Sequence, residues 1–471
     1  MNNQFNKNNL EKLGIFELRN LARDIGVHSP TIYKKKEIIE KILDIINGKV
    51  EPYTAKTKQG RPPKSISSVN NILDIFIPKN EQAVKNERYI NDYSKLTNLS
   101  SLSAMETNAN INYNTTNDEK VSAILQVFKE GYGYCYTKGY HTNEITENFF
   151  VSNTLIDNFK LRTGDIIQGY VKKISEDKPL VMYKIEKINN IDSQKFDKSR
   201  QHFCSLKAFN PTQKIIFDEQ NNSLNTAYFN KFLPIGKGQR AIFVLSKNTD
   251  YSNLIKGFLN SVSQKNNLEK QCILIDERPE DITEYTQDLK NTKVISTNVD
   301  DAPFQANQNI EIAVERAKRK VEQGKDILLF ISNLNRLQNL YKKQIASLNA
   351  ASTEQVEINS LTMVRKILSF ARNTKTAGSL TIVSIVEKNS NSEFVSDLKE
   401  LCNMQIYIDE KNYPKQNKLW FDILCSETRK MQLLTNEKEY EFIKKFKEDL
   451  NKENVQQKTK ELEQKLLNNS N

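Results

Sequence analysis

The sequence is poor in the residues that build metal centres and disulfide frameworks. Its 471 residues include five cysteines and three histidines, and the cysteines are scattered, odd in number and never spaced as C-x-x-C. This pattern argues against structural zinc and against disulfide pairing. No apolar run approaches the roughly 18 residues of a membrane helix, and the start, MNNQFNKNNL, lacks the apolar core of a secretory signal. We therefore expect a reduced, cytoplasmic protein with no metal site and no membrane contact.

Acidic residues are fewer than basic ones. The chain has 58 Asp and Glu against 69 Lys and Arg, which gives a net charge of +11 and a pI of about 9.0. An excess of this size favours a polyanionic partner such as nucleic acid. A lysine-rich surface without such a partner would give the same balance, so the motifs have to decide between the two.

The N-terminal part of the chain predicts two unlike segments. In residues 1–50, apolar residues recur at helical spacing up to Gly26 and again from 36 to 46, which predicts a compact helical module. Residues 51–118 are rich in Pro, Asn, Ser and Thr and predict a flexible linker. Within it, residues 59–64 (QGRPPK) are similar to an AT-hook, which enters the minor groove, although basic proline-rich clusters are also common in linkers.

The rest of the chain predicts a barrel followed by an α/β domain. Residues 119–188 alternate like short strands broken by glycine, as in a small OB-type β-barrel. The expected barrel strands are 124–127, 131–136, 148–151, 165–171 and 180–185. Residues 189–471 alternate buried strands with helices such as 310–321, as in an α/β RecA-like domain. Its expected strands are 241–245, 272–275, 294–296, 327–331 and 380–385. From Glu437 the tail predicts either a surface helix or a helix for a partner.

Short motifs along the chain resemble those of the transcription termination factor Rho family, in the family's order. They are 131–134 (GYGY), 161–165 (LRTGD), 234–240 (PIGKGQR), 273–280 (ILIDERPE), 317–319 (AKR), 371–373 (ARN), 378–381 (GSLT) and 428–430 (TRK). The resemblance covers residues 119–435 and, more loosely, the first fifty. It implies a multidomain protein with a SAP-like N-terminal module, an OB fold that binds pyrimidine-rich single-stranded RNA, and a RecA-like P-loop-type domain. Rho itself is a hexameric, RNA-dependent ATPase and helicase.

Residues 131–136 carry the expected RNA-binding side chains. Since side chains alternate along a strand, Tyr132, Tyr134 and Tyr136 share one face, where an exposed ring can stack a base at about 1–3 kcal/mol. Lys172 and Lys184 are the candidate phosphate contacts. The glycines between the tyrosines would let the backbone approach the nucleic acid. The alternative is that one or both of Tyr132 and Tyr134 pack inward as barrel core.

The resemblance places a phosphate loop, G-x-x-x-x-G-K-[ST], where residues 246–254 read SKNTDYSNL. By position, Asp250 replaces the second glycine, Tyr251 replaces the lysine, and only Ser252 is compatible with a nucleotide. A carboxylate at Asp250 would repel phosphate by on the order of 4 kcal/mol at about 4 Å and an effective dielectric near 20. The same residue can cap a helix. We therefore expect a strand-to-helix turn that is capped from within the chain.

Further positions depart from the family pattern. Ser332 stands where an acid organises Mg²⁺, and Glu410 lies near the place of the intersubunit arginine. The glycine-free segment 342–360 lies where RNA-gripping loops are expected, and Pro179 replaces an aromatic of the RNA-binding strand. Together these departures predict impaired or lost ATP hydrolysis, and weaker RNA binding or an altered base preference.

Other family residues are kept. Glu277 matches the glutamate that activates water for hydrolysis, and Arg278 follows it. The two also suit a structural role, which we favour, as a turn after a strand with Arg278 paired to a neighbouring acid. Arg372 matches an arginine that senses nucleotide at the family's subunit interface, where it would form an ion pair.

These observations leave three hypotheses. The first is a Rho relative that binds single-stranded RNA without hydrolysing ATP and acts in transcription termination or its regulation. It would form a homo-oligomer, a hexameric ring by resemblance, or join a catalytic Rho, with RNA polymerase as a further partner. The second is an active RNA-dependent ATPase that uses ATP and Mg²⁺ through a divergent loop, with Ser252, Glu277 and Arg278 at the nucleotide. The third is a structural nucleic-acid-associated protein that uses the N-terminal module and the linker.

Overall fold

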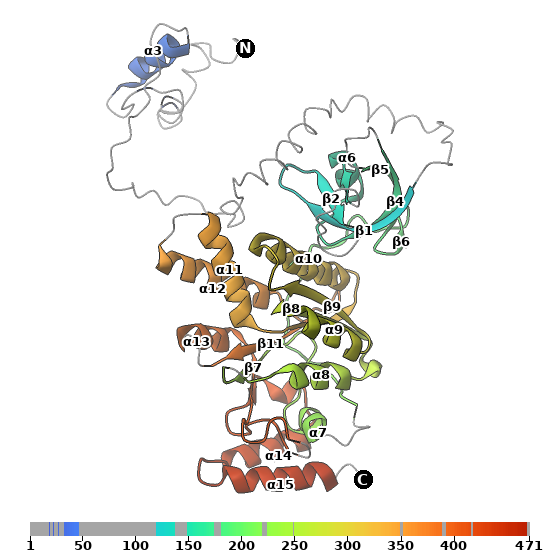
Figure 1. Ribbon diagram of the computed structural model, residues 1–471, viewed down its shortest axis with the longest axis vertical. Coiled ribbons are helices and arrows are strands. Elements are labelled where there is room, and N and C mark those ends of the chain that lie inside the picture. Colours follow the sequence, from blue (N-terminus) through green and yellow to red (C-terminus); the bar gives the residue numbers. More distant parts are fainter. Residues whose placement is uncertain are drawn as a thin grey trace. The chain divides into compact units, whose positions relative to one another are not determined.

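The chain divides into two units, residues 1–74 and 75–471, in the computed structural model, and Figure 1 labels their helices and strands. The structure describes residues 18, 22, 27, 33–46, 119–136, 148–173, 180–218, 224–247, 249–348, 352–388, 392–415 and 418–468. None of the helices in these ranges is both long and apolar enough to cross a lipid bilayer.

The first unit contains helix α3, Lys35–Ile46, which confirms the helix expected from residue 36. The Glu37 carboxylate accepts the backbone N–H of Lys34 at 2.9 Å and so satisfies a donor at the helix start. The small core of this unit is formed by Leu18, Ala22, Val27, Ile38, Ile39 and Ile42. The SAP-like prediction is not confirmed, and the linker and the AT-hook-like segment lie outside the described residues.

The described part of the second unit starts with a small β-barrel, as the sequence predicts. Its strands are β1 (Glu119–Val127), β2 (Gly133–Tyr136), β3 (Asn148–Val151), β4 (Ile166–Lys172), β5 (Leu180–Ile188) and β6 (Ile191–Asp192). They follow the order β3-β2-β1-β4-β5-β6, and an additional β3–β5 pairing closes the sheet. The barrel interior includes Leu125, Cys135, Phe149, Val171 and Met182, together with Leu155 and Ile156 of helix α6 (Asn153–Phe159).

An α/β domain follows the barrel, and its sheet has the order β13-β12-β7-β11-β10-β8-β9. The strands are β7 (Arg240–Leu245), β8 (Leu268–Glu277), β9 (Thr292–Asn298), β10 (Asp326–Ile331), β11 (Leu380–Glu387), β12 (Met404–Tyr407) and β13 (Glu427–Thr428). Neighbouring strands are parallel except for β12 and β13. Each strand expected in this domain lies within an observed one, which confirms the α/β prediction. The carboxyl ends of β7, β8, β10, β11 and β12 meet at one edge of the sheet, where open α/β sheets bind their ligands.

Helices cover both faces of this sheet, as Figure 1 shows. The helices are α7 (Leu224–Lys231), α8 (Ser252–Ser261), α9 (Pro279–Asp288), α10 (Pro303–Glu322), α11 (Leu334–Leu348), α12 (Thr353–Ser369), α13 (Ser392–Leu401), α14 (Glu437–Glu448) and α15 (Val455–Asn468). One core joins the sheet to α7–α9, α14 and α15, and the other joins it to α10–α13. The tail buries Ile443, Phe446, Leu462 and Leu466 in the first of these cores, so the tail helices pack on their own chain.

The segment 161–165 joins the barrel to helix α10. The Asp165 carboxylate is fully buried and accepts two bonds from the Arg200 guanidinium, at 2.8 and 2.5 Å. Glu322 of α10 lies 3.8 Å from the same guanidinium and is also fully buried. Gly164 has φ +90°, and a Cβ there would lie 2.6 Å from the backbone of α10. The family motif therefore has a packing explanation here, because both the glycine and the aspartate are needed for this close approach.

Candidate functional site

Four aromatic rings cluster where β2 meets β1 and β3. The Tyr132 ring is stacked with those of Phe128 and Phe150, with centroid distances of 5.3 and 5.7 Å and interplanar angles of 23° and 27°. The Tyr134 ring meets those of Tyr132 and Phe150 edge-on, at 6.3 and 5.9 Å. Phe150 is buried, while Phe128, Tyr132 and Tyr134 are half-buried. We call these four residues the aromatic cluster.

Strand register shows which way the aromatic cluster faces. Tyr134 pairs with Phe150, Phe150 with Val181, and Val181 with Lys172. Directly opposed residues share a face of the sheet, and the residues flanking this row, such as Phe149, fill the barrel interior. The row therefore points outward, so that Tyr134 and Lys172 stand on one outer face. The prediction that Tyr132 or Tyr134 contributes to the barrel core is not supported.

Two of the expected RNA contacts lie elsewhere. Tyr136 has an exposed fraction of 8% and packs with Ile124 of β1 and Ile312 of α10. Its hydroxyl donates to Gln126 at 2.9 Å. The expectation that Tyr136 extends an exposed stacking face is therefore wrong, because a helix of the α/β domain covers that end of the strand. Lys184 is exposed on β5, with its Nζ 5.5 Å from the centroid of the Tyr170 ring, and does not lie in the Lys172 row.

The two glycines of the GYGY motif have structural roles. Gly131 has φ +90°, a conformation that suits glycine. Gly133 pairs with Val127 and Val151, so its missing side chain would face the barrel interior. A Cβ there would lie 2.6 Å from Leu125 Cδ1. The expectation that these glycines admit nucleic acid to the backbone is replaced by a turn and a packing requirement.

The segment aligned with the phosphate loop is a turn closed by its own side chains. The Asp250 carboxylate accepts the N–H of Ser252 at 2.9 Å and its hydroxyl at 2.6 Å. Since α8 begins at Ser252, this carboxylate satisfies a donor that a phosphate would otherwise bind. The Tyr413 hydroxyl donates to the carbonyl oxygen of Asp250 at 2.6 Å. The geometry matches the expected turn capped from within.

Tyr251 turns into the protein and contacts Glu277. Its ring is 8% exposed and belongs to the core beneath α8. The Tyr251 hydroxyl donates to Glu277 Oε1 at 3.2 Å, and Arg336 Nη1 lies 2.8 Å from Glu277 Oε2. The Arg336 guanidinium lies 5.7 Å from the centre of the Tyr251 ring. These three side chains form a closed triad in which both carboxylate oxygens of Glu277 already have partners.

Local backbone geometry aims Glu277 into this triad. Strand β8 has an irregularity between Leu274 and Glu277 where it pairs with β9, and Asp276 adopts φ +55°. Such a bulge redirects the next side chain. Arg336 lies near the start of α11, and its Nη1 also donates to the carbonyl oxygen of Asp276 at 3.0 Å. Arg336 thereby links the turn after β8 to the helix that follows β10.

Burial dominates the electrostatics of the triad. Desolvation raises the pKa of Glu277 above its ordinary value, while Arg336 and the Tyr251 hydroxyl act in the opposite direction. Burial and the neighbouring Glu277 carboxylate together raise the pKa of Tyr251, which keeps its hydroxyl protonated and able to donate. Tyr251 therefore supplies a neutral donor at the position where the family motif has a cation.

The other polar groups at the carboxyl edge are also paired with each other. The Ser332 hydroxyl is buried and accepts the N–H of Ile275 at 3.0 Å, so it fastens β10 to β8. Asn333 donates to Glu387 at 2.7 Å. Glu410 accepts the Ser246 hydroxyl and lies 3.3 Å from Lys388 Nζ. Among the described residues, no group of three or more His, Cys, Asp or Glu side chains is arranged to hold a metal ion.

The remaining expected nucleotide residues are not brought to the triad. Arg278 is exposed just before α9. Within the described ranges no ion pair joins it to a carboxylate, so the acid-paired prediction for Arg278 is not supported there. Arg372 pairs with Leu380 at the amino end of β11, and its guanidinium lies 4.4 Å from the centre of the Phe203 ring. Lys256, on α8 beyond Tyr251, also lies away from Glu277 and is 2.8 Å from Asp288 on α9.

The segment expected to hold RNA-gripping loops is helical on both sides. Residues 334–348 form α11 and residues 353–369 form α12, and the intervening 349–351 lie outside the described residues. Lys342 on α11 is 2.6 Å from Glu357 on α12. The two helices therefore pack as a pair over most of the segment.

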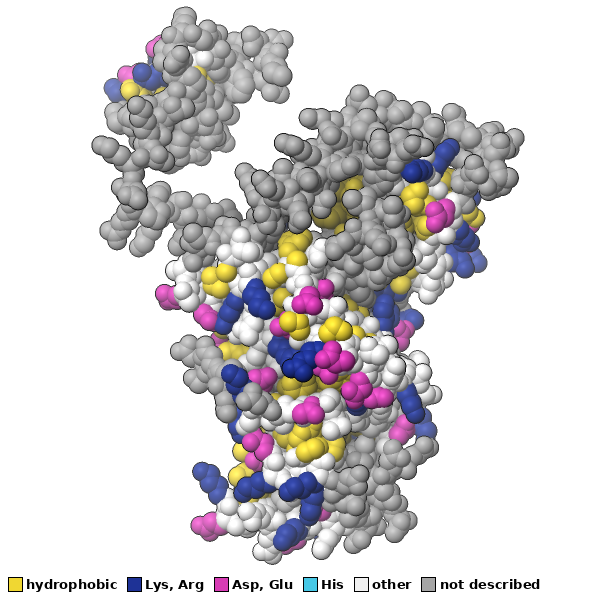
Figure 2. Space-filling model, viewed as in Figure 1, with side chains coloured by type: hydrophobic (Ala, Val, Ile, Leu, Met, Phe, Trp, Pro, Cys, Tyr) yellow, Lys and Arg dark blue, Asp and Glu magenta, His cyan; other side chains and the backbone are white. Residues whose placement is uncertain are grey.

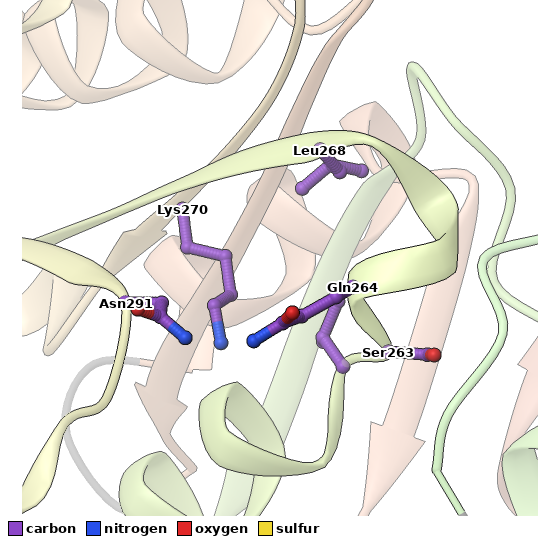
Figure 3. Close-up of a pocket in the computed structure, with 6 residues that line it drawn as sticks. Ser263, Gln264, Leu268, Lys270 and Asn291 are labelled. Carbon is purple, nitrogen blue, oxygen red and sulfur yellow. The ribbon is translucent and has the colours of Figure 1, made fainter.

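A pocket of about 190 Å³ lies away from all of these residues. It is lined by Val262, Ser263, Gln264, Leu268, Lys270 and Asn291. Leu268 and Lys270 begin β8, whereas Glu277 ends it, so the pocket and the triad lie at opposite ends of that strand. Figure 3 shows the Lys270 amine within the pocket, and this amine also donates to the carbonyl oxygen of Leu259 at 2.7 Å.

Three residues of these sites were not anticipated from the sequence: Phe128, Phe150 and Arg336. Phe150 stands in a strand that was expected, and its alternation with Phe149 is a signal for one inward and one outward ring. Arg336 follows an expected strand by one helical turn. Its partner Glu277 follows another, and the adjacency of those two strands has no local sequence signal.

The matching family model and the curated relatives agree on one family. Residues 121–194 match the model described as "Rho termination factor, RNA-binding domain". Transcription termination factor Rho of Borreliella burgdorferi is 30% identical over 328 residues, which are 68% of this chain and 63% of that protein. The Rho of Mycobacterium leprae is 29% identical over 344 residues, 70% of this chain and 55% of that protein. The Rho of Aquifex aeolicus is 29% identical over 323 residues, 67% of this chain and 74% of that protein.

The chain thus spans 63% and 55% of the length of the first two of these relatives. A solved ATPase from the type III secretion system of pathogenic bacteria matches 51% of this chain and 69% of its own, with a TM-score of 0.44 and 18% identity. A likeness of that degree carries no conclusion about function.

Proposed function

Because the chain belongs to the transcription termination factor Rho family, we propose that it binds single-stranded RNA through its barrel and acts in transcription termination or its regulation without hydrolysing ATP. The observation that carries the RNA-binding part is the outward row of Tyr134, Phe150 and Lys172, with Tyr132 stacked beside it. Aromatic rings that stack bases next to a cation that meets phosphate are what sequence-tolerant binding to single strands requires.

The loss of hydrolysis is supported by the closed triad. A glutamate that activates water needs a carboxylate oxygen that can accept a proton from that water. In this chain Glu277 Oε1 accepts the Tyr251 hydroxyl and Oε2 is paired with Arg336. The nearby Asp250 carboxylate fills the helix terminus that would bind phosphate. Nucleotide binding would have to break these contacts without a lysine to replace them.

RNA binding is tested by fluorescence anisotropy with a labelled pyrimidine-rich RNA. Replacing Tyr132 and Tyr134 together with alanine should weaken binding about tenfold or more, since each stacked base contributes about 1–3 kcal/mol. Tyr136→Phe is the matched control on the same strand, because it removes only a buried hydroxyl. Equal affinity of the double variant and the wild type would refute RNA binding at the aromatic cluster.

Loss of ATP use is tested by calorimetry with ATP and Mg²⁺, with and without RNA. We expect no heat of binding at millimolar ATP and no phosphate release stimulated by RNA. Micromolar ATP binding, together with phosphate release that Glu277→Gln abolishes, would instead support the alternative of an active RNA-dependent ATPase with a divergent loop.

Assembly is the last part of the proposal. The family resemblance implies a ring of subunits, so the chain would assemble with copies of itself or enter a ring with a catalytic Rho, and RNA polymerase would be a further partner. Light scattering of the purified chain, alone and mixed with an ATP-hydrolysing Rho, distinguishes these arrangements by mass. A monomer under both conditions would refute both.

A further inference from the structure

A second group of aromatic and basic side chains lies on the outer face of β4 and β5. The Tyr170 and Tyr183 rings are 6.5 Å apart with an interplanar angle of 34°. The Nζ atoms of Lys184 and Lys120 lie 5.5 and 5.9 Å from the centre of the Tyr170 ring. We call these four residues the β4–β5 patch. Figure 2 shows Lys and Arg side chains on the barrel surface.

Strand register places the patch outside the barrel. Tyr170 pairs with Lys120 on one side and with Lys184 on the other, so the three side chains share a face. The neighbouring Val171 and Ile185 belong to the barrel interior. Since alternate residues point to opposite faces, Tyr170 and both lysines point outward.

The charges of the patch are arranged around one acid. Glu186 lies 2.6 Å from Lys120 Nζ, and the Lys120 side chain keeps an exposed fraction of 60%. Hydrogen bonds from Lys120 and Tyr170 hold the pKa of Glu186 below its ordinary value. Glu186 therefore offsets the charge of Lys120 and orients the Tyr170 ring. The charge of Lys184 also lowers the pKa of Glu186, so this acid acts on both lysines of the patch. Lys172, two residues beyond Tyr170 on β4, is exposed.

The β4–β5 patch and the aromatic cluster form one continuous outer surface. Tyr170 and Lys172 face the same way on β4, and Lys172 is joined through Val181 to Phe150 by strand pairing. Two strand spacings and one two-residue step place Tyr170 about 12 Å from Phe150 between Cα atoms. A single strand that occupies about 4–16 nucleotides on an OB-type fold can cover both.

We propose that the β4–β5 patch is a second contact for the same single-stranded RNA, in which Tyr170 and Tyr183 stack a base and Lys184 and Lys172 meet phosphates. The inference rests on the RNA binding proposed above and extends it. Aromatic rings beside exposed lysines suit a polyanion with flat bases. The patch would increase the number of nucleotides that contact the protein. An RNA short enough to end at the aromatic cluster would not reach it.

Two RNA lengths separate the two binding surfaces in an anisotropy experiment on the full chain. One probe is a pyrimidine RNA of about three nucleotides, which the aromatic cluster can hold, and the other has about ten. Tyr170→Leu should weaken the longer RNA about tenfold and leave the shorter one unchanged. Lys184→Glu should do the same, and it should reduce the dependence of log affinity on log salt by about 0.7 for each phosphate that the variant no longer binds.

Lys198→Glu is the matched control for the charge reversal, because Lys198 is also exposed and lies 5.0 Å from an aromatic centre, that of Phe159. If the wild-type chain binds both RNAs, and Tyr170→Leu and Lys184→Glu bind the longer RNA as well as the wild type does, this inference alone is overturned. The patch would then serve another partner. A wild-type chain that binds neither RNA overturns the proposed function and this inference with it. Weakening of both lengths by Lys184→Glu would also overturn the inference.

Discussion

Replacing Arg336 with methionine should destabilise the α/β domain by about 2–3 kcal/mol. Arg336 Nη1 is 2.8 Å from Glu277 Oε2, and the Glu277 side chain is 7% exposed. Removing one partner of a buried ion pair costs about 3–5 kcal/mol, because the other charge stays buried. The Arg336 side chain is 35% exposed, so water screens the pair and lowers the cost to the stated range. Methionine keeps the length and apolar character of the arginine stem.

The single tryptophan of the chain gives a local probe for this experiment. Trp420 packs against the core of the α/β domain, 5.1 Å from the Tyr413 ring, so its fluorescence in urea follows unfolding of that domain. A shift of the midpoint at constant slope measures the change in stability. Glu277→Gln and the double variant complete a cycle, and we expect a coupling of about 1–2 kcal/mol, with the double variant more stable than additivity gives.

Two outcomes would refute the structural interpretation of the triad. A coupling below about 0.5 kcal/mol would mean that Glu277 and Arg336 act independently. A change in stability below about 0.5 kcal/mol for Arg336→Met would be the behaviour of a solvated surface pair and would contradict the structural role of the triad.

Three further perturbations test neighbouring parts of the argument. Burial raises the pKa of Glu277, so the folded state binds the carboxyl proton of Glu277 more tightly than the unfolded state does. The free energy of unfolding should therefore fall as pH rises through the folded pKa. Glu277→Gln should remove this part of the pH dependence, as measured by urea titrations at several pH values. Asp250→Ala should cost about 1 kcal/mol through the loss of the bonds to Ser252 without creating ATP binding in calorimetry. Gly133→Ala, which would place a Cβ 2.6 Å from Leu125 Cδ1, should destabilise the barrel by about 1–3 kcal/mol, as measured by hydrogen exchange of β1 and β2; unchanged protection would contradict the packing role.

Local sequence patterns predicted the strands of both β-containing domains because each pattern depends only on the burial of that strand's own side chains. The apolar runs 241–245 and 327–331 are buried on both sides in a parallel sheet, so no knowledge of their neighbours was needed. The prediction for Tyr136 failed for the opposite reason. Alternation gave its face correctly, but that face is covered by Ile312, which lies in a helix far along the chain. Coverage of an exposed face by a distant element leaves no mark on the local sequence.

The segment aligned with the phosphate loop shows the same limit of local sequence patterns. One motif was enough to predict that Tyr251 stands in place of the lysine and that Asp250 caps the helix, because each feature depends on a few adjacent residues. The pairing of the Glu277 carboxylate could not be predicted in this way, because its partner Arg336 meets it only where β8 and β10 are neighbours in the sheet. The sequence offered only a pairing of Arg278 with a neighbouring acid and gave no sign of Arg336. Partners across a parallel sheet follow strand order, which short motifs do not encode.

The triad also explains how the motif at residues 273–280 can be retained in a chain that does not hydrolyse ATP. Once Tyr251 stands in place of the lysine, Glu277 has a donor from its own chain, and Arg336 supplies the compensating charge. Replacing Glu277 alone would then leave Arg336 without its carboxylate and Tyr251 without its acceptor, at a cost in stability that is independent of ATP. The segment 273–280 is therefore expected to persist on folding grounds, and its presence is not evidence for hydrolysis. The residues that decide between the two roles are those at positions 250, 251 and 332, where a polar side chain either faces a nucleotide or, as here, bonds to its own chain.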